Sequence, residues 1–249
     1  MPTSLPTPAD GRPQTPREAF DELMAGNRRF VGNAAHYPNQ GSWHRSSLAE
    51  GQEPFATIFG CADSRVPPEL VFDRVLGDLF TVRTAGHATD PGVLGTLEYG
   101  IAVCGTPLLA VVGHQSCGAV GAALLARDSG DMPGGFIGEL LQRVVPSVDS
   151  AAREGRTEVH EVVAEHVRRT VRELVEVSDV IASAIDSGSL GVVGLTYNLS
   201  SGETSVVEAL GDLGKVDLVS VVTVQAERAA YAADAVHKGS FAESGSISG

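Results

Sequence analysis

The sequence has no long apolar run and is short of positive charge. Even its richest apolar stretch, residues 101–112, contains Gly105, Thr106 and Pro107, whereas a membrane-spanning helix needs roughly 18 consecutive apolar residues. Lys and Arg together number 18 against 31 Asp and Glu, which gives a net charge of −13. A chain this acidic repels phosphate backbones and anionic lipid surfaces, so neither nucleic acid nor a membrane is expected as a partner.

Cysteine is also scarce, and the three in the chain are Cys61, Cys104 and Cys117. This small, odd number does not make a disulfide framework. The start of the chain lacks the basic segment and apolar block of a signal peptide. The sequence therefore predicts a cytoplasmic protein, in which a cysteine near histidines indicates a metal site or catalysis. Cys104 lies in an apolar stretch and is expected to be a small core residue.

The sequence does have 249 residues, 43% of them apolar, which is enough for one large α/β domain. Short apolar runs alternate with helical patterns, and such runs are typical of parallel strands buried on both faces. We therefore predict a three-layer α/β fold in which helices flank a mostly parallel sheet of about four parallel strands and one antiparallel edge strand. The expected strands are 55–59, 79–82, 108–112, 191–197 and 204–208, and the expected helices are 93–103, 118–127 and a pair within 159–185 that meets near Ser178.

Three segments are expected along the chain. A proline-rich lead-in, 1–14, is predicted to be disordered, and the main domain spans 15–214. Its first helix begins at Pro16, because Thr15 and Glu18 form a capping box around that residue. Residues 215–249 are expected to form a C-terminal extension that is partly disordered.

Two loops carry residues with metal-binding chemistry, and each directly follows a predicted strand. The first contains Cys61, and the second contains His114 and Cys117. Because the carboxyl ends of parallel strands meet at one edge of a sheet, these three side chains can converge. Two thiolates and an imidazole suit Zn²⁺, and a set of only three ligands leaves an open position, as in catalytic zinc sites.

Asp63 and Arg65 extend this constellation, since they follow Cys61 at alternate positions. Asp63 can bind the metal as a fourth ligand in a closed state, or accept a hydrogen bond from a zinc-bound hydroxide. Arg65 can hold that carboxylate away from the metal through a charge-assisted bond. A hydrolase built on a Cys–His dyad is an alternative, but it leaves the second cysteine without a role.

The motifs Cys-Ala-Asp-Ser-Arg at 61–65 and Gly-His-x-x-Cys-Gly at 113–118 resemble the two signatures of the β-class carbonic anhydrases. The resemblance runs from about Phe20 to Gly214 and is strongest to actinobacterial members and the plant-type branch. It includes Val-Arg-Thr-Ala-Gly at 82–86.

This resemblance implies an activity and a set of site residues. The activity is the reversible hydration of CO₂ to bicarbonate and a proton by a zinc-bound hydroxide. One Zn²⁺ per chain is held by Cys61, His114 and Cys117, and Asp63 and Arg65 form a gating dyad. It further implies a homodimer or larger homo-oligomer, with the substrate pocket at the interface. The substrate-binding positions are Gln52 (from the adjoining subunit), Phe80, Ala85, Tyr99 and the backbone amide of Gly118.

Two other functions use the same residues. Hydrolysis of CS₂ or COS requires the same metal centre with a different entrance, and a non-catalytic zinc-binding protein requires only the ligands. Ile58 stands where another branch of the resembled family has a tryptophan, so that branch's inhibitory bicarbonate site is not expected.

Overall fold

The computed structural model of the chain describes residues 11–36 and 42–218. The predicted disordered segment 1–14 and the extension 215–249 lie mostly outside these residues, so both remain predictions. Within the described ranges, no helix combines the length and the apolar character needed to cross a membrane.

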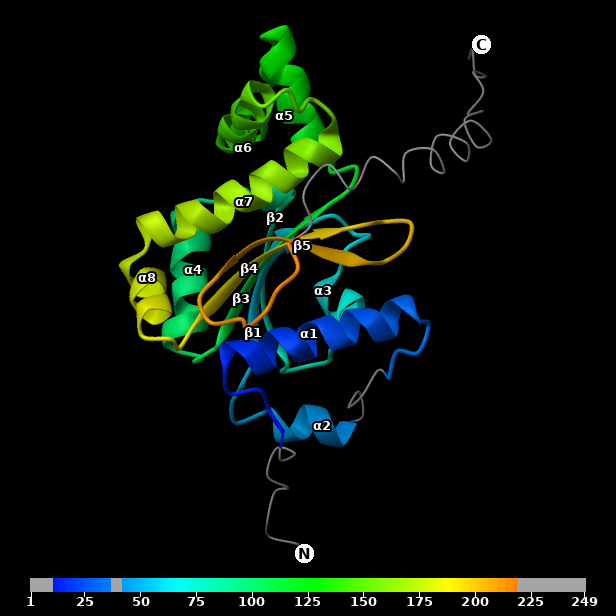
Figure 1. Cartoon of the computed structure of the whole chain (residues 1–249), viewed down its shortest axis with the longest axis vertical. Helices are drawn as coiled ribbons and strands as arrows, with labels where there is room; N and C mark the ends of the chain where they lie inside the picture. Colours follow the sequence, from blue (N-terminus) through cyan, green and yellow to red (C-terminus); the bar gives the residue numbers. More distant parts are fainter. Residues whose placement is uncertain (1–10, 37–41, 219–249) are drawn as a thin grey trace, which may run out of the picture. The chain divides into compact units, whose positions relative to one another are not determined.

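A five-stranded sheet forms the centre of the domain (Figure 1), in the order β2-β1-β3-β4-β5. Four neighbouring strands are parallel, and β5 pairs antiparallel with β4 at one edge, which confirms the predicted fold class. Every residue of β1 and β3 is buried, and their continuous apolar runs reflect this burial on both faces. The strands are β1 (Ala56–Cys61), β2 (Leu79–Thr84), β3 (Leu108–His114), β4 (Gly191–Tyr197) and β5 (Thr204–Leu210).

Eight α-helices and a short 3₁₀ turn, η1 (Ala85–His87), accompany the strands within the described residues. The capping box of Thr15 and Glu18 is present at the first helix, and Ser178 separates the pair within 159–185, as predicted. The helices are α1 (Pro16–Val31), α2 (Ser42–Ser47), α3 (Pro68–Val71), α4 (Pro91–Ala102), α5 (Gly118–Ser129), α6 (Gly135–Arg153), α7 (Val159–Val177) and α8 (Asp179–Asp186).

Helices α1 and α7 cover opposite faces of the sheet, and two glycines of β4 show this. A Cβ atom at Gly191 would meet Pro16 of α1, whereas a Cβ atom at Gly194 would meet Val167 of α7. Residues three apart on a strand point to opposite faces, so the sheet is the middle of three layers. This arrangement confirms the predicted layering.

Helix α7 also lies unusually close to the sheet. A Cβ atom at Gly113 would stand 2.6 Å from Cγ2 of Val167, and one at Gly194 would stand 2.7 Å from Cγ1 of the same valine. Real Cβ atoms essentially never come so near another atom. Val167 therefore occupies the space left by two missing side chains in neighbouring strands.

The expectation for Cys104 was wrong. Helix α4 ends at Ala102, and Cys104 follows it in a turn that Gly105 closes with a φ of 67°. The thiol is half-buried there instead of lying in the core.

The strand order has a topological switch point at the end of β1. After β1 the chain continues to β2 on one side, and β3 joins on the other. At such a point the connections leave the sheet in opposite directions, and ligands of open α/β sheets bind outside the carboxyl ends of the strands. Cys61 is the last residue of β1 and His114 the last residue of β3, so the topology brings both predicted ligands to this switch point.

Candidate metal centre

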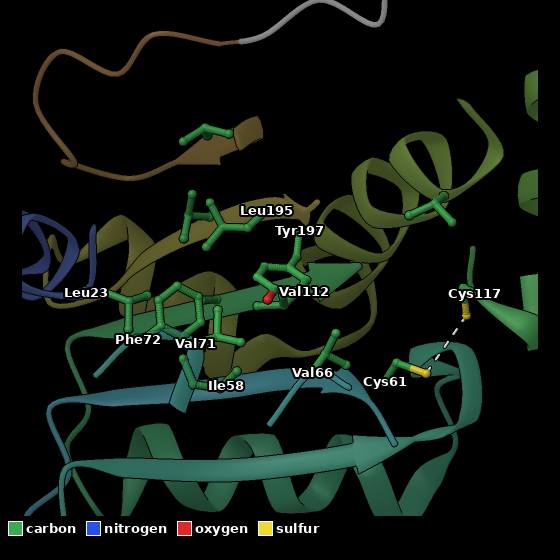
Figure 2. Close-up of a cluster of buried hydrophobic side chains, with 14 of the residues drawn as sticks. Leu23, Ile58, Cys61, Val66, Val71, Phe72, Val112, Cys117, Leu195 and Tyr197 are labelled. Atoms are coloured by element: carbon green, nitrogen blue, oxygen red, sulfur yellow. Dashed lines mark hydrogen bonds between the residues drawn. The ribbon is translucent and has the colours of Figure 1, made fainter. Parts of the chain in front are cut away.

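The structure brings Cys61, His114 and Cys117 together. Their three ligand atoms all lie within 4.8 Å of one another, and all three residues are buried. Figure 2 shows the two sulfur atoms facing each other at the carboxyl end of the sheet, 3.9 Å apart. Two sulfurs bound to one tetrahedral zinc at about 2.3 Å each would lie roughly 3.8 Å apart, so the spacing fits zinc.

Each ligand is placed by the element that ends or begins at it. Cys61 and His114 close neighbouring strands, while Cys117 is the residue that caps the N-terminus of α5. Ser116, with a φ of 52°, turns the chain between His114 and Cys117. A thiolate at a helix N-terminus is stabilised by the dipole of the helix, which favours the metal-binding form of Cys117.

The imidazole of His114 is oriented for metal binding. Its Nδ1 atom donates a hydrogen bond to the carbonyl oxygen of Gln115 at 2.8 Å, which leaves Nε2 as the free lone pair. That Nε2 atom is buried and has no hydrogen-bond partner among the described residues. An unpartnered buried nitrogen beside two sulfurs is the arrangement that a zinc ion would satisfy.

The two sulfurs share one proton, because two adjacent thiolates repel each other without a metal. The pKa of Cys61 is lowered, first by the hydrogen bond from the Cys117 thiol and also by hydrogen bonds from backbone N–H groups. Those N–H groups are Asp63 at 3.4 Å and Gly86 at 3.3 Å from Sγ. The pKa of Cys117 is raised by its bond to Cys61 and by burial. The two sulfurs are thus coupled through one short contact.

Asp63 and Arg65 form a closely bonded pair beside the ligands. Oδ1 of Asp63 accepts from the backbone N–H and from Nε of Arg65, both at 2.9 Å, and Oδ2 accepts from Nη2 at 2.7 Å. The guanidinium holds the pKa of this carboxyl well below its usual range. Nη2 also lies 3.3 Å from the carbonyl oxygen of Ser116, so Arg65 joins the two loops. The carboxylate is thus anionic and paired with Arg65.

Arg83 is a site residue that has no motif of its own beyond the stretch 82–86. From β2, its Nε donates to the carbonyl oxygen of Cys61 at 2.9 Å and its Nη2 to that of Asp63 at 2.6 Å. These bonds fix the backbone of the candidate ligand Cys61 and of Asp63. A half-buried arginine in a strand that ends at the site is the signal that identifies it.

Two buried histidines, His87 and His166, lie behind the ligands. Their rings stack with centroids 4.1 Å apart. Burial lowers the pKa of His166 to about 4 and holds that of His87 well below its usual value, so both are neutral. The sequence offered one indication of this pair, since His166 lies on the apolar face of α7 between Val163 and Val167.

The predicted pocket residues fall into two groups in one chain. Ala85 begins the turn η1, whose next residue bonds Cys61, and Gly118 follows Cys117, so both lie at the metal cluster. Phe80 and Tyr99 stack on each other with centroids 6.0 Å apart, but Phe80 pairs with Thr57 at the start of β1.

Gln52 is exposed and precedes β1, so it too lies toward the amino ends of the strands. From Thr57 to Cys61 a strand rises about 13 Å. Within one chain, Gln52 and the Phe80–Tyr99 pair are therefore separated from the ligands by about the length of the strand.

Comparisons with known proteins agree with this site. The family model described as carbonic anhydrase matches residues 56–204, a range that contains all three ligands and the dyad. "Carbonic anhydrase 2" of Mycobacterium tuberculosis is 46% identical over 200 residues, which cover 80% of this chain and 97% of that protein. The chain belongs to the β-class carbonic anhydrase family.

Other relatives support the same membership. A carbonic anhydrase of Mycolicibacterium smegmatis is 45% identical over 81% of this chain and 98% of its own length. Among solved structures, a tetrameric β-carbonic anhydrase of Sordaria macrospora superposes with a TM-score of 0.62 at 24% identity, covering 77% of this chain and 98% of that one. At that identity the structural match speaks for the fold, which is the fold of this β-class carbonic anhydrase family.

Proposed function

We propose that the protein catalyses the reversible hydration of CO₂ to bicarbonate and a proton, with one Zn²⁺ per chain held by Cys61, His114 and Cys117. The observation that carries this proposal is the cluster of two buried sulfurs and an unpartnered imidazole nitrogen within 4.8 Å, beside a carboxylate that is held by an arginine. Zinc in such a site supplies the Lewis acidity that makes water a nucleophile near neutral pH.

The chain's own residues orient the reactants. Asp63 presents an anionic oxygen next to His114 Nε2, where it accepts a hydrogen bond from the attacking water and aims its lone pair. Arg65 holds the carboxylate in this orientation, in which it would not bind a metal at the three candidate ligands. The backbone N–H of Gly118 is one of the first in α5 and has no partner within the helix, so it is available to a substrate oxygen.

We further propose that the working form is a homodimer or larger homo-oligomer. Gln52, Phe80 and Tyr99 stand at the far end of the strands from the ligands of their own chain. A second copy is what can bring such a group to the first copy's metal, and Tyr99 is half-exposed as a contact residue would be in an isolated chain. A related structure of the same fold is described as tetrameric.

A cytoplasmic location agrees with this chemistry. The three cysteines are free thiols, and two of them must stay reduced to bind a metal. An oxidising compartment would favour joining the adjacent sulfurs of Cys61 and Cys117, which would abolish the site.

Metal analysis combined with stopped-flow CO₂ hydration tests the proposed function. We expect one zinc per chain and hydration activity that disappears when a chelator strips the metal. A purified protein that is metal-free and fully active, or zinc-loaded and inactive toward CO₂, would contradict the proposal. COS and CS₂ are assayed in parallel, and turnover of either without CO₂ hydration would assign the site to that hydrolysis instead.

A further inference from the structure

We propose that His166 is a positioning residue for Cys61 and acts through the backbone of Gly86. The inference rests on the proposed zinc site and adds a residue that lies outside the ligands and the Asp63–Arg65 dyad. His166 belongs to α7, 49 positions along the chain from Cys117, the nearest candidate ligand, and reaches the site by folding alone.

The hydrogen bonds of His166 determine its tautomer. Its Nε2 atom lies 2.8 Å from the carbonyl oxygen of Gly86, and a carbonyl oxygen only accepts, so Nε2 carries the proton. Its Nδ1 atom lies 2.8 Å from Oγ of Ser147, and in a neutral ring this nitrogen accepts. Ser147 and Gly86 thus hold the imidazole at both ends, and the ring is buried.

Gly86 connects His166 to the sulfur of Cys61 through hydrogen bonds at both of its backbone polar groups. Its backbone N–H donates to Sγ of Cys61 at 3.3 Å, while its carbonyl oxygen accepts from His166. The residue has a φ of 62°, and a Cβ atom there would stand 2.9 Å from the Cβ of Ala119 in α5. Glycine has the most freedom of backbone conformation of any residue type. The N–H of Gly86 therefore stays directed at Cys61 only if another group fixes the peptide. His166 is the side chain that holds it.

The aim of this N–H affects the metal ligand. A hydrogen bond to a thiolate withdraws charge from sulfur, stabilises the anion and orients its remaining lone pairs toward the metal. Cys61 accepts two such bonds, from Gly86 and from Asp63, and the second comes from its own loop. Among the described residues, His166 therefore holds the one backbone N–H that reaches Cys61 from outside its own loop.

His87 supports the arrangement from the other side. Its ring stacks on that of His166 and meets Phe59 edge-on with centroids 6.0 Å apart. Because His87 is itself fully buried and uncharged, it keeps water from His166 and favours the neutral ring whose Nε2–H donates. A charged ring would lose the acceptor that binds Ser147.

The test uses the zinc-loaded full chain with His166→Leu and His166→Gln. Leucine removes both hydrogen bonds, whereas the glutamine amide can donate to Gly86 and accept from Ser147. We expect His166→Leu to release zinc to a chelator about tenfold faster than the wild type, as for loss of other groups that orient metal ligands. We also expect the Gly86 amide resonance to move upfield, and kcat to fall at unchanged KM. His166→Gln should restore most of each property.

Leu174→Ala is the matched control, because it empties a fully buried site two turns further along α7 without touching η1. It should lower thermal stability but leave zinc release and the Gly86 resonance unchanged. Equal acceleration of zinc release by Leu174→Ala would overturn the proposal, as would a folded His166→Leu protein with wild-type zinc release. If His166→Leu does not fold, Ser147→Ala decides, since it should shift both properties in the same direction by less and no shift refutes the role.

These outcomes separate the inference from the proposed function. A wild-type protein that holds zinc without hydrating CO₂ would refute the function, and the zinc-release comparison would still decide the role of His166. A wild-type protein that holds no zinc would also refute the function, and the Gly86 resonance would then decide whether His166 places this N–H on Cys61.

Discussion

The carboxylate of Asp63 lies 3.9 Å from the Nε2 atom of His114. At that distance a small side-chain rotation would place a carboxylate oxygen on the metal. The bonds from Arg65 are what oppose this rotation. The structure therefore has Asp63 paired with Arg65, the arrangement in which its carboxylate would not bind a metal held by the three candidate ligands.

Replacing Arg65 should let Asp63 block the open metal position while zinc stays bound. In Arg65→Ala the Asp63 carboxylate loses its partner and becomes free to bind the metal, so we expect kcat/KM to fall about 100-fold with zinc content intact. Arg172→Ala is the matched control, because Arg172 makes an exposed pair with Glu208 at 2.6 Å, remote from the ligands. Stopped-flow CO₂ assays and zinc analysis measure both effects, and unchanged turnover in Arg65→Ala would refute the gating role.

Substitution of Cys61 and of Cys104 should have different effects on zinc content and activity. Cys61→Ser replaces a buried sulfur ligand with a weakly acidic hydroxyl, so we expect loss of most of the zinc and of all activity. Cys104→Ser changes a half-buried thiol outside the cluster and should keep one zinc per chain and wild-type activity. Full zinc retention in Cys61→Ser would exclude Cys61 as a ligand.

Hydration activity should rise with pH above neutrality. Two thiolates cancel the charge of Zn²⁺, so this site should lower the pKa of bound water less than a three-histidine site does. In a three-histidine site the pKa of the bound water is about 7. Asp63 does not produce this rise, because the bond from Arg65 keeps its pKa far below the working range. A kcat profile recorded across about pH 6.5 to 9 checks this, and a flat profile would be inconsistent with a dithiolate site.

Stability should fall on the acid side because of His166. Burial lowers its pKa from 6.5 in the unfolded chain to about 4 in the folded protein. Between pH 6.5 and about 4, His166 binds a proton in the unfolded chain but not in the folded protein. Its contribution to the free energy of unfolding is therefore fully present above pH 6.5 and declines as the pH falls. We expect this histidine to account for a loss of about 3 kcal/mol across that window. Urea unfolding of the wild type and His166→Gln at several pH values isolates it, and parallel pH curves would contradict the assignment.

The Phe80–Tyr99 pair should matter only if a second copy supplies it. For Tyr99→Ala we expect unchanged zinc and a fall in kcat/KM of about tenfold, because the pocket that positions CO₂ loses a wall. Val177→Ala, at an equally exposed apolar side chain on α7, is the control and should have little effect. Wild-type kinetics in Tyr99→Ala would remove this residue from the pocket.

Much of the fold could be predicted from local pattern. The runs that became β1 and β3 are apolar throughout because both faces are covered, and the capping box at Thr15 places the start of α1 to the residue. Helix α6 was missed because glycines open it and Pro146 lies inside it, features that usually argue against a helix. Its packing against α5 and α7 overrides those local preferences.

The three candidate ligands could be predicted from the sequence, whereas the residues that support them could not. Cys61, His114 and Cys117 are chemically distinctive and directly follow apolar strands, so topology alone brings them together. His166, Arg83 and Gly86 act through hydrogen bonds between segments distant in the sequence, and no local pattern encodes such partners. The separation of Phe80 from the metal likewise depends on strand register, which was not deduced from the sequence.

The close seating of α7 on the sheet has a consequence for which substitutions the protein tolerates. Val167 fits over Gly113 and Gly194, and its neighbour in the chain is the histidine that bonds η1. An added methyl group at either glycine would lift the helix and draw that imidazole away from its carbonyl partner. Substitution of either glycine by alanine is ordinarily a mild exchange. Here it should lower the affinity for the metal, although all three candidate ligands are retained.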